Sequence, residues 1–453
     1  MKTLGVVALA IGLVACDGGG PSTDAGLDAG GADAGTDAGP PPSYYTLSGV
    51  DPSADPADLA PLEGILDGVD VVGIGESVHT TGGELEMRVR LIEYLVESLG
   101  YRAIALENPR LLTAQTIAPY VADCSGTAED AARGFNPIWW DRTTPALLTW
   151  LCEFNRDHPS DPVTIHGLDI HEPYDTFREA QALLEAAAPS DAAGLLDGMR
   201  TCLGIGFADQ VEYFMDPAVR SYYAGTLPLP DSDHMACLAG TSATLDYLSS
   251  NRDALVAASS AREVELARLS VSALAALDTT IYHLSRGDLG AANPSRDTAM
   301  ADAFLTLRGL DFPDAKTILF AHNGHVMVAS DEVSSGQWRG VENLGTQIEA
   351  ALGTRYAAIG QASRTTYIDW DQGPQTLLHT DAAYLEEVLD QLGPPYLLVD
   401  TQLALMSSPP LWDATIAYRL GFDTMSPSLH YRAIVYHRES RANDYFTPPP
   451  FAM

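Results

Sequence analysis

Lysine is nearly absent from this chain: Lys2 and Lys316 are the only two among its 453 residues. Arginine does not make up the difference, because 25 basic residues stand against 61 acidic ones and leave a formal net charge of −36. A chain with this charge offers no basic patch that could neutralise a phosphate backbone. We therefore expect no nucleic-acid partner.

Three catalytic signatures are absent as well. No G-x-S-x-G occurs, so the sequence does not support a serine nucleophile of the α/β-hydrolase type. No H-E-x-x-H occurs, which removes the commonest zinc-protease helix. Gly73-Ile74-Gly75 begins like a dinucleotide-binding G-x-G-x-x-G, but Val78 stands where the third glycine is needed. Nothing in these patterns calls for a cofactor.

The N-terminus has the pattern of an export signal. Lys2 precedes an apolar run that is too short to span a bilayer, and Leu13-Val14-Ala15-Cys16 follows it. We predict a lipoprotein signal over residues 1–16 whose lipobox ends at Cys16. The lipid on Cys16 would anchor the protein to a membrane of the cell envelope, on its periplasmic or outer side. The alternative is an ordinary cleaved signal with an incidental cysteine.

The next segment, residues 17–43, is built from Gly, Ala, Asp and Pro with almost no bulky apolar side chain. It is unable to bury enough surface to fold, so we predict a disordered linker. The globular domain is expected over residues 44–453.

Cysteine is scarce, with five in the chain, and none has the C-x-x-C spacing of a redox or zinc-thiolate motif. The even number that remains after Cys16 favours disulfides in an exported protein. Three pairings are open, and we expect the two local ones, Cys124–Cys152 and Cys202–Cys237.

Apolar, β-branched runs alternate with helical patterns along most of the chain, as in the helix expected over residues 84–98. This alternation predicts an α/β fold with a largely parallel central sheet flanked by helices. Strand signals nearly vanish between Asp191 and Arg286. We predict a helical subdomain at about residues 190–290 that lies over the active-site cleft.

Four of the apolar runs end at a residue capable of chemistry: Glu76, Glu107, Asp169 and His322. Ligands of open α/β sheets bind beyond the carboxyl ends of the strands. A sheet core requires no acidic residue or histidine at these ends. Their recurrence therefore predicts a site built from all four.

Residues 73–88 contain both a helix start and candidate catalytic groups. Thr81-Gly82-Gly83-Glu84 fits a capping box, which would make Thr81 and Glu84 structural. His79 comes just before this helix, where the helix dipole favours the neutral imidazole that a general base needs. Glu76 or Glu107 would hold its other ring nitrogen. Arg88 would pair with an acid or stabilise an oxyanion, and the alternative is a cation on the surface of the helix.

His322 and His325 belong to one segment, Ala-His-Asn-Gly-His, and their spacing allows both to face one pocket. Two histidines with Glu76 and Glu107 also make a set that could bind zinc or iron. The carboxylates match no recognised metal motif, so we assign no metal ligand, and metal dependence stays open as an alternative.

Taken together, these motifs resemble the erythromycin esterase family. The strongest matches are Gly73–His79, Glu84–Arg88 and the helix that ends with Tyr94-Leu95 before Gly100, followed by the strand that ends at Glu107 and by the Ala-His-Asn-Gly-His block. Weaker matches lie in the segment WWDRTTPALLTWLCEFN, in HGLD, which contains Asp169, and in SRDTAMADAF, which contains Arg296.

The resemblance implies that His79 is the general base that activates water, with Glu76, Arg88 and Glu107 around it. His322 matches a later catalytic histidine, and His325 lies beside it. We expect Arg88, His325, Asp169 and Arg296 to bind the substrate or its transition state. The resemblance also implies an α/β core, a helical region over a deep cleft and no required metal.

The sequence therefore predicts an exported hydrolase of small-molecule esters or lactones that needs no metal. Two alternatives remain: a metal-dependent hydrolase or protease built on the same Glu/His cluster, and a surface lipoprotein that binds a ligand without turnover.

Overall fold

The computed structural model describes residues 44–203, 216–336, 338–370, 373–404, 418–420 and 423–447. The predicted signal, lipidation site and linker lie outside these ranges.

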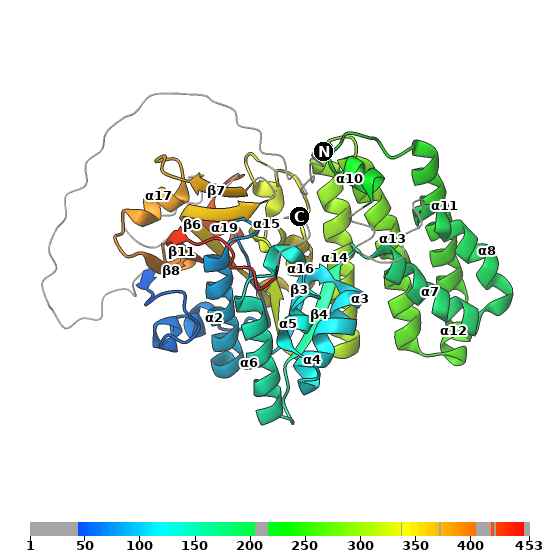
Figure 1. Cartoon of the computed structure of the whole chain (residues 1–453), viewed down its shortest axis with the longest axis horizontal. Coiled ribbons are helices and arrows are strands. Elements are labelled where there is room, and N and C mark those ends of the chain that lie inside the picture. The colour runs from blue at the N-terminus through cyan, green and yellow to red at the C-terminus, as the bar shows by residue number, and fades with distance from the viewer. Residues whose placement is uncertain are drawn as a thin grey trace, which may run out of the picture.

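A nine-stranded sheet lies at the centre of the described residues, in the order β1-β8-β11-β6-β2-β5-β3-β4, with β7 paired to β6 (Figure 1). The strands are β1 (Tyr44–Thr46), β2 (Val71–Ile74), β3 (Tyr101–Pro109), β4 (Thr164–Asp169), β5 (Lys316–Phe320), β6 (Tyr356–Trp370), β7 (Gly373–Leu378), β8 (Tyr396–Asp400) and β11 (Ala433–Ser440). Every neighbour pair from β11 to β4 is parallel, whereas β1, β7 and β8 pair antiparallel. The predicted α/β fold with a largely parallel sheet is confirmed. A separate hairpin joins β9 (Tyr418–Leu420) to β10 (Asp423–Met425).

The described helices are α1 (Leu62–Ile65), α2 (Gly82–Leu99), α3 (Arg110–Leu112), α4 (Ala118–Asp123), α5 (Ala128–Ala132), α6 (Thr143–Asp157), α7 (Pro173–Ala187), α8 (Pro189–Met199), α10 (Pro217–Tyr223), α11 (Asp231–Ser250), α12 (Arg252–Ala258), α13 (Ala261–Leu284), α14 (Leu289–Asp311), α15 (Asn323–Val326), α16 (Leu344–Leu352), α17 (Leu385–Asp390), α18 (Thr401–Ala404) and α19 (Pro427–His430). None of them is long and apolar enough to cross a membrane.

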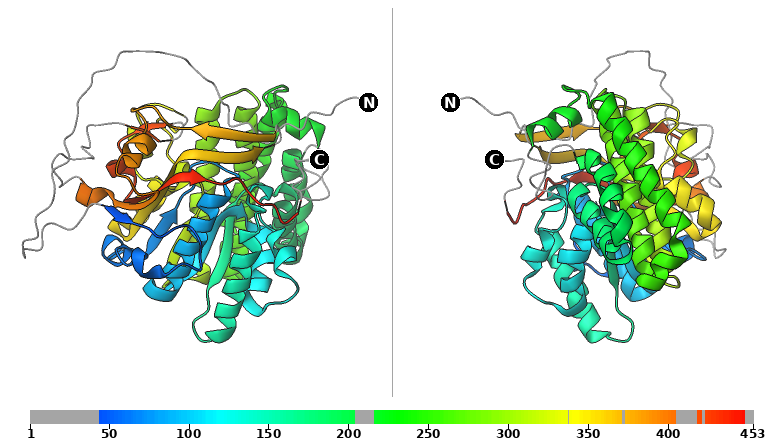
Figure 2. Two further views of the ribbon diagram at one scale, coloured as in Figure 1. Left: turned by 60° about the vertical axis from the view of Figure 1, so that its left-hand side comes forward. Right: turned by 90° about the vertical axis from the view of Figure 1, so that its right-hand side faces the viewer.

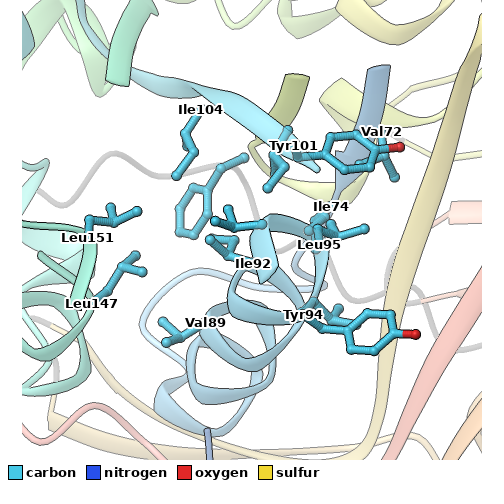
Figure 3. Close-up of a cluster of buried hydrophobic side chains, with 14 of the residues drawn as sticks. Val72, Ile74, Val89, Ile92, Tyr94, Leu95, Tyr101, Ile104, Leu147 and Leu151 are labelled. Carbon is cyan, nitrogen blue, oxygen red and sulfur yellow. The ribbon is translucent and has the colours of Figure 1, made fainter. Parts of the chain in front are cut away.

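Helices cover both faces of the sheet because the buried strands are apolar on both sides. Val72 and Ile74 pack with α2 and α6 in one core, in which Figure 3 shows side chains of both helices below the strands. Val71, on the opposite face, packs in a second core with α14 and α16. Because the strands from β11 to β4 run parallel, their carboxyl ends lie at one edge of the sheet, where the loops that follow them can form a site.

The helical region is a third packing unit beside the β4 edge of the sheet, and Figure 2 (right) shows its long helices side by side. Its own core joins α7, α8, α11, α12 and α13. The described residues between Pro173 and Asp311 contain no strand, so the helical stretch is longer than residues 190–290.

Both predicted disulfides are present. Cys124–Cys152 joins the end of α4 to α6, and Cys202–Cys237 joins the segment after α8 to α11. Each bond closes a local loop, so each restricts the unfolded chain without connecting the helical region to the sheet.

Candidate active site

The four residues predicted at strand ends meet at one edge of the sheet. Glu76 follows β2, His322 follows β5, Glu107 lies near the end of β3, and Asp169 ends β4. These strands are consecutive parallel neighbours in the order β2-β5-β3-β4, so their carboxyl ends lie side by side.

Glu76 is the centre of the first group of contacts. Its carboxylate is 1% exposed and accepts hydrogen bonds from His79 Nδ1 at 2.5 Å, from Arg88 Nη2 and from Trp139 Nε1 at 3.1 Å. Burial by itself raises the pKa of Glu76, but the charge of Arg88 and the hydrogen bond from His79 outweigh it and hold the pKa below its usual range. Glu76 is therefore an ionised anchor for the imidazole.

Arg88 is fully buried, with its guanidinium carbon 3.7 Å from the centre of the Phe320 ring. Nη2 donates to Glu76, and Nη1 lies 3.4 Å from the carbonyl oxygen of Ala321. Of the two roles expected from the sequence, the structure shows the pairing with an acid. Because no part of the side chain is exposed, the guanidinium faces Glu76, Ala321 and Phe320 and not the solvent.

His322 lies beside His79, with 5.2 Å between the ring centres. It is the N-cap of α15: its Nδ1 accepts a hydrogen bond from the backbone N–H of Gly324, and its Nε2 donates to the carbonyl oxygen of Ser77 at 3.2 Å. Burial and the nearby imidazoles of His79 and His325 lower the pKa of His322 to about 3. His322 is therefore a neutral donor through Nε2–H.

Glu107 is the centre of a second group of contacts. One carboxylate oxygen accepts from Arg296 Nη2 at 2.8 Å, and the other accepts from the backbone N–H of His322 at 2.8 Å. Arg296 also forms a two-pronged ion pair with Asp169, at 3.0 Å from Nε and 2.8 Å from Nη2. Burial opposes ionisation, but these partners and His325 hold the pKa of Glu107 well below its usual range.

His325 completes the second group. Its Nδ1 bonds the buried Asp297, and its Nε2 lies 3.3 Å from Glu107 Oε1 and 3.1 Å from Arg296 Nη1. Burial lowers the pKa of His325, but Asp297 and Glu107 together raise it to about 9. His325 is therefore an imidazolium at neutral pH and shares Glu107 with Arg296.

Glu84 corrects one prediction from the sequence. Helix α2 does begin after Thr81, but Thr81 makes no side-chain cap, and Glu84 does not reach back to it. The Glu84 carboxylate instead accepts from the backbone N–H and the hydroxyl of Ser77 at 2.7 and 2.6 Å, and from the Ser363 hydroxyl at 2.5 Å. The capping box fails because Ser77 and Ser363, brought close by the fold, offer the buried carboxylate better donors than Thr81.

Sequence reasoning missed three residues that contact the predicted ones. Trp139 bonds Glu76, Asp297 bonds His325, and His171 bonds Asp169 at 2.9 Å. Trp139 and Asp297 lie in segments that resemble the family, in the WWD stretch and directly after Arg296, whereas His171 lies two residues beyond the HGLD segment. Spacing alone gave no reason to choose them over their neighbours.

In the part of the chain that the structure describes, no group of three or more His, Cys, Asp or Glu side chains is arranged to hold a metal ion. A pocket opens at the carboxyl end of β4 against α7, α13 and α14, and its lining includes Asp169 and Glu172. The helical region thus forms a wall next to the second group of contacts.

Comparison with known proteins gives the family. A family model described as erythromycin esterase matches residues 96–444. Erythromycin esterase type II of Escherichia coli is 20% identical over 317 residues, which are 68% of this chain and 72% of that protein. The "Putative hydrolase YbfO" of Bacillus subtilis (strain 168) is 28% identical over 140 residues, 31% of this chain, and the chain spans 30% of its length.

Solved structures agree with the family in their fold. A mutant of the erythromycin esterase EreC in its open conformation has a TM-score of 0.72 at 17% identity, covering 89% of this chain and 100% of that one. A succinoglycan biosynthesis protein has a TM-score of 0.68 at 17% identity, covering 88% of this chain and 95% of that one. With its sequence motifs, its strand-end site and a family match over most of its length, the chain belongs to the erythromycin esterase family.

Proposed function

We propose that the chain hydrolyses small-molecule carboxylic esters or lactones, with His79 as the general base that activates water. The observation that carries this proposal is the state of the His79 ring. Its Nδ1 is held by the buried, ionised Glu76, and its Nε2 makes no hydrogen bond to any residue that the structure describes. The side chain is 15% exposed, so Nε2 is the atom available to a water molecule at the strand edge.

The reaction balances with these groups alone. His79 Nε2 takes a proton from water while the water oxygen bonds the carbonyl carbon, and the carbonyl π electrons move to its oxygen. Collapse of the tetrahedral intermediate then breaks the bond to the alkoxy oxygen, which takes the proton back from Nε2. The products are a carboxylic acid and an alcohol, joined in one molecule when the substrate is a lactone.

The residues around His79 have supporting roles in this reaction. Glu76 stabilises the imidazolium that forms on His79, and Arg88 keeps Glu76 in place. His322 Nε2–H, which makes a long hydrogen bond of 3.2 Å in the free protein, is the donor for the oxyanion. Glu107, Asp169, Arg296 and His325 form the side of the site that faces the substrate's remaining groups.

We further propose that the enzyme lies outside the cytoplasm and is attached to a membrane by the lipid on Cys16. The export pattern of residues 1–16 supports this location, and the two disulfides are compatible with an oxidising compartment. The substrate is then an ester or lactone met in the cell envelope or the medium.

The direct test is a screen of the purified protein against a panel of esters and lactones by mass spectrometry, with and without EDTA. We expect products that gain the mass of one water, at equal rates in both conditions. Loss of activity in EDTA together with stoichiometric bound zinc or iron would replace this mechanism with a metal-dependent one.

His79→Ala tests the base on any substrate that the screen identifies. We expect kcat/KM to fall by about 100- to 10,000-fold. The variant should still fold, because His79 lies in a loop outside the core. His158→Ala, at the opposite end of the sheet after α6, is the matched control and should keep full activity. Comparable rates for His79→Ala and the control would refute His79 as the base.

A further inference from the structure

Thr80, directly after His79, has a backbone conformation that its side chain disfavours. Its φ is +67°, in the left-handed region, where a β-branched side chain is strained. Only two other non-glycine residues of the described chain have positive φ: Cys124, at a disulfide, and Ala329. Thr80 is fully buried, and its hydroxyl has no hydrogen-bond partner among the described residues. Strain of this kind persists where the surrounding structure enforces it.

The C-terminal segment, Ser440–Asn443, encloses the turn from one side. The backbone N–H of Asn443 donates to the carbonyl oxygen of Thr80 at 3.1 Å, and Thr81 forms an isolated antiparallel bridge with Ala442. The hydroxyls of Thr81 and Ser440 are also hydrogen-bonded. These contacts fix the residues immediately after His79.

The close approach of this segment explains the two glycines that follow. A Cβ on Gly82 would lie 2.0 Å from Arg441 Nη1, and one on Gly83 would lie 2.7 Å from Ser440 Oγ. The start of α2 is therefore shaped to accept the C-terminal segment, which reaches it from 359 residues away along the chain.

The other side of the turn is held independently. Ser77 is bonded to Glu84, its carbonyl oxygen accepts from His322, and the carbonyl oxygen of Glu76 accepts from the backbone N–H of Asn323 at 2.8 Å. Both ends of the stretch from Glu76 to Thr81 are thus fixed, and Thr80 supplies the change of direction between them.

We propose that Thr80 is a positioning residue for His79: its branched side chain, held in the left-handed conformation by Ser440–Asn443, limits the turn to one shape and so aims the imidazole. This inference rests on the proposed function, because the aim of the imidazole affects the reaction only if His79 is the general base. Glycine would adopt the same φ without strain, but it would also allow the turn other shapes. The hydroxyl has no partner to lose, so valine should serve as well as threonine.

The experiment compares Thr80→Gly with Thr80→Val in the full chain. With p-nitrophenyl butyrate as the probe ester, we expect Thr80→Gly to lower kcat by about 10- to 100-fold with KM changed less than twofold, since misplacing a reacting group costs rate rather than binding. We expect Thr80→Val to keep the kcat of the parent protein. Ala329→Gly, which relieves the positive φ elsewhere, is the control and should leave kcat unchanged.

A second measurement needs no turnover. In protein labelled with ¹⁵N-histidine, the ring signals of His79, assigned by their loss in His79→Ala, should report a single Nδ1–H tautomer. Thr80→Gly should broaden or shift these signals, whereas Thr80→Val should not. If the parent protein hydrolyses no ester but the signals change as expected, the proposed function fails and the positioning role stands.

Two results would overturn the inference. The first is a Thr80→Gly protein with the kcat and the His79 signals of the parent. The second is a Thr80→Val protein that loses as much activity as Thr80→Gly, which would assign the effect to the hydroxyl. If Thr80→Gly does not fold, Thr80→Asn replaces it, because asparagine tolerates the left-handed region and carries no branch at Cβ.

Discussion

The buried carboxylate of Glu76 organises the residues around it at the scale of single side chains. An isolated carboxylate in this position would be neutral, because burial disfavours the charged form. Arg88, Trp139 and His79 together supply enough donors and charge to keep it ionised. The arrangement fixes which nitrogen of His79 carries the proton, and it leaves Nε2 without a hydrogen bond to any described residue.

The raised pKa of His325 should make the stability of the folded protein depend on pH. Asp297, Glu107, Arg296 and His322 are the charged or titratable groups that face it, and its pKa in the folded protein is about 9. Because this value lies above that of an unfolded histidine, about 6.5, the stabilisation is complete below pH 6.5 and is lost as the pH rises through 9.

We expect the free energy of unfolding, measured by urea titration, to fall by on the order of 3 kcal/mol between pH 6.5 and 10 through this residue. His325→Gln should lack this part of the fall, whereas His158→Gln should retain it. Identical pH profiles for His325→Gln and the parent protein would show that the imidazolium contributes nothing to stability.

At the scale of elements, α2 begins at the residue that the sequence predicted, but the contact predicted to start it is not formed. The pattern Thr81-Gly82-Gly83-Glu84 predicted where the helix begins, and the helix does begin there. Glu84, however, is fully buried and bonds Ser77 and Ser363, so it joins α2 to the loop of His79 and to β6. A side chain expected to cap one helix thus connects three elements.

Glu84→Ala should therefore cost more than the loss of a cap. Removing the carboxylate leaves the buried donors of Ser77 and Ser363 unpaired, so we expect a loss of about 2–4 kcal/mol in the free energy of unfolding. Thr127, whose side chain does cap α5, is the matched control, and Thr127→Ala should cost about 1 kcal/mol. Equal losses in the free energy of unfolding for the two variants, measured by urea titration, would show that Glu84 acts only as a helix cap.

At the scale of the whole molecule, the sheet order brings distant segments together. Arg296, on α14 in the helical region, contacts Glu107 from 189 residues away, and the backbone of His322 contacts the same carboxylate from 215 residues away. The helical region therefore does more than cover the sheet, since α14 contributes side chains to the site. Changes in how α14 packs would alter Glu107 directly.

The proposed lipid anchor at Cys16 would decide where the whole molecule is located. Cys16→Ser should move the protein from the membrane fraction to the released fraction after cell lysis, because lipid would no longer be attached. Immunoblots of the two fractions provide the measurement. Cys124→Ser, which removes a disulfide instead, should stay with the membrane. A Cys16→Ser protein that sediments with membranes as the parent does would contradict lipidation at this residue.

Much of this protein was determined by local sequence. Periodicity of apolar residues predicted the parallel sheet and the strand-free helical region, and Glu76, Glu107, Asp169 and His322 were recognised as polar endings of buried runs. The local disulfide pairs followed from the same logic of short separations. These features depend on neighbours in the chain, so the sequence carries them directly.

The tertiary structure alone decided which of these groups touch. Nothing in the spacing indicates that Glu76 takes His79 and Arg88 while Glu107 takes Arg296 and His325, because those choices depend on the strand order β2-β5-β3-β4 and on the docking of α14. The strained turn at Thr80 is likewise invisible in the sequence, since a segment 359 residues away holds it. Contacts between distant segments follow from packing, and packing is a property of the folded chain as a whole.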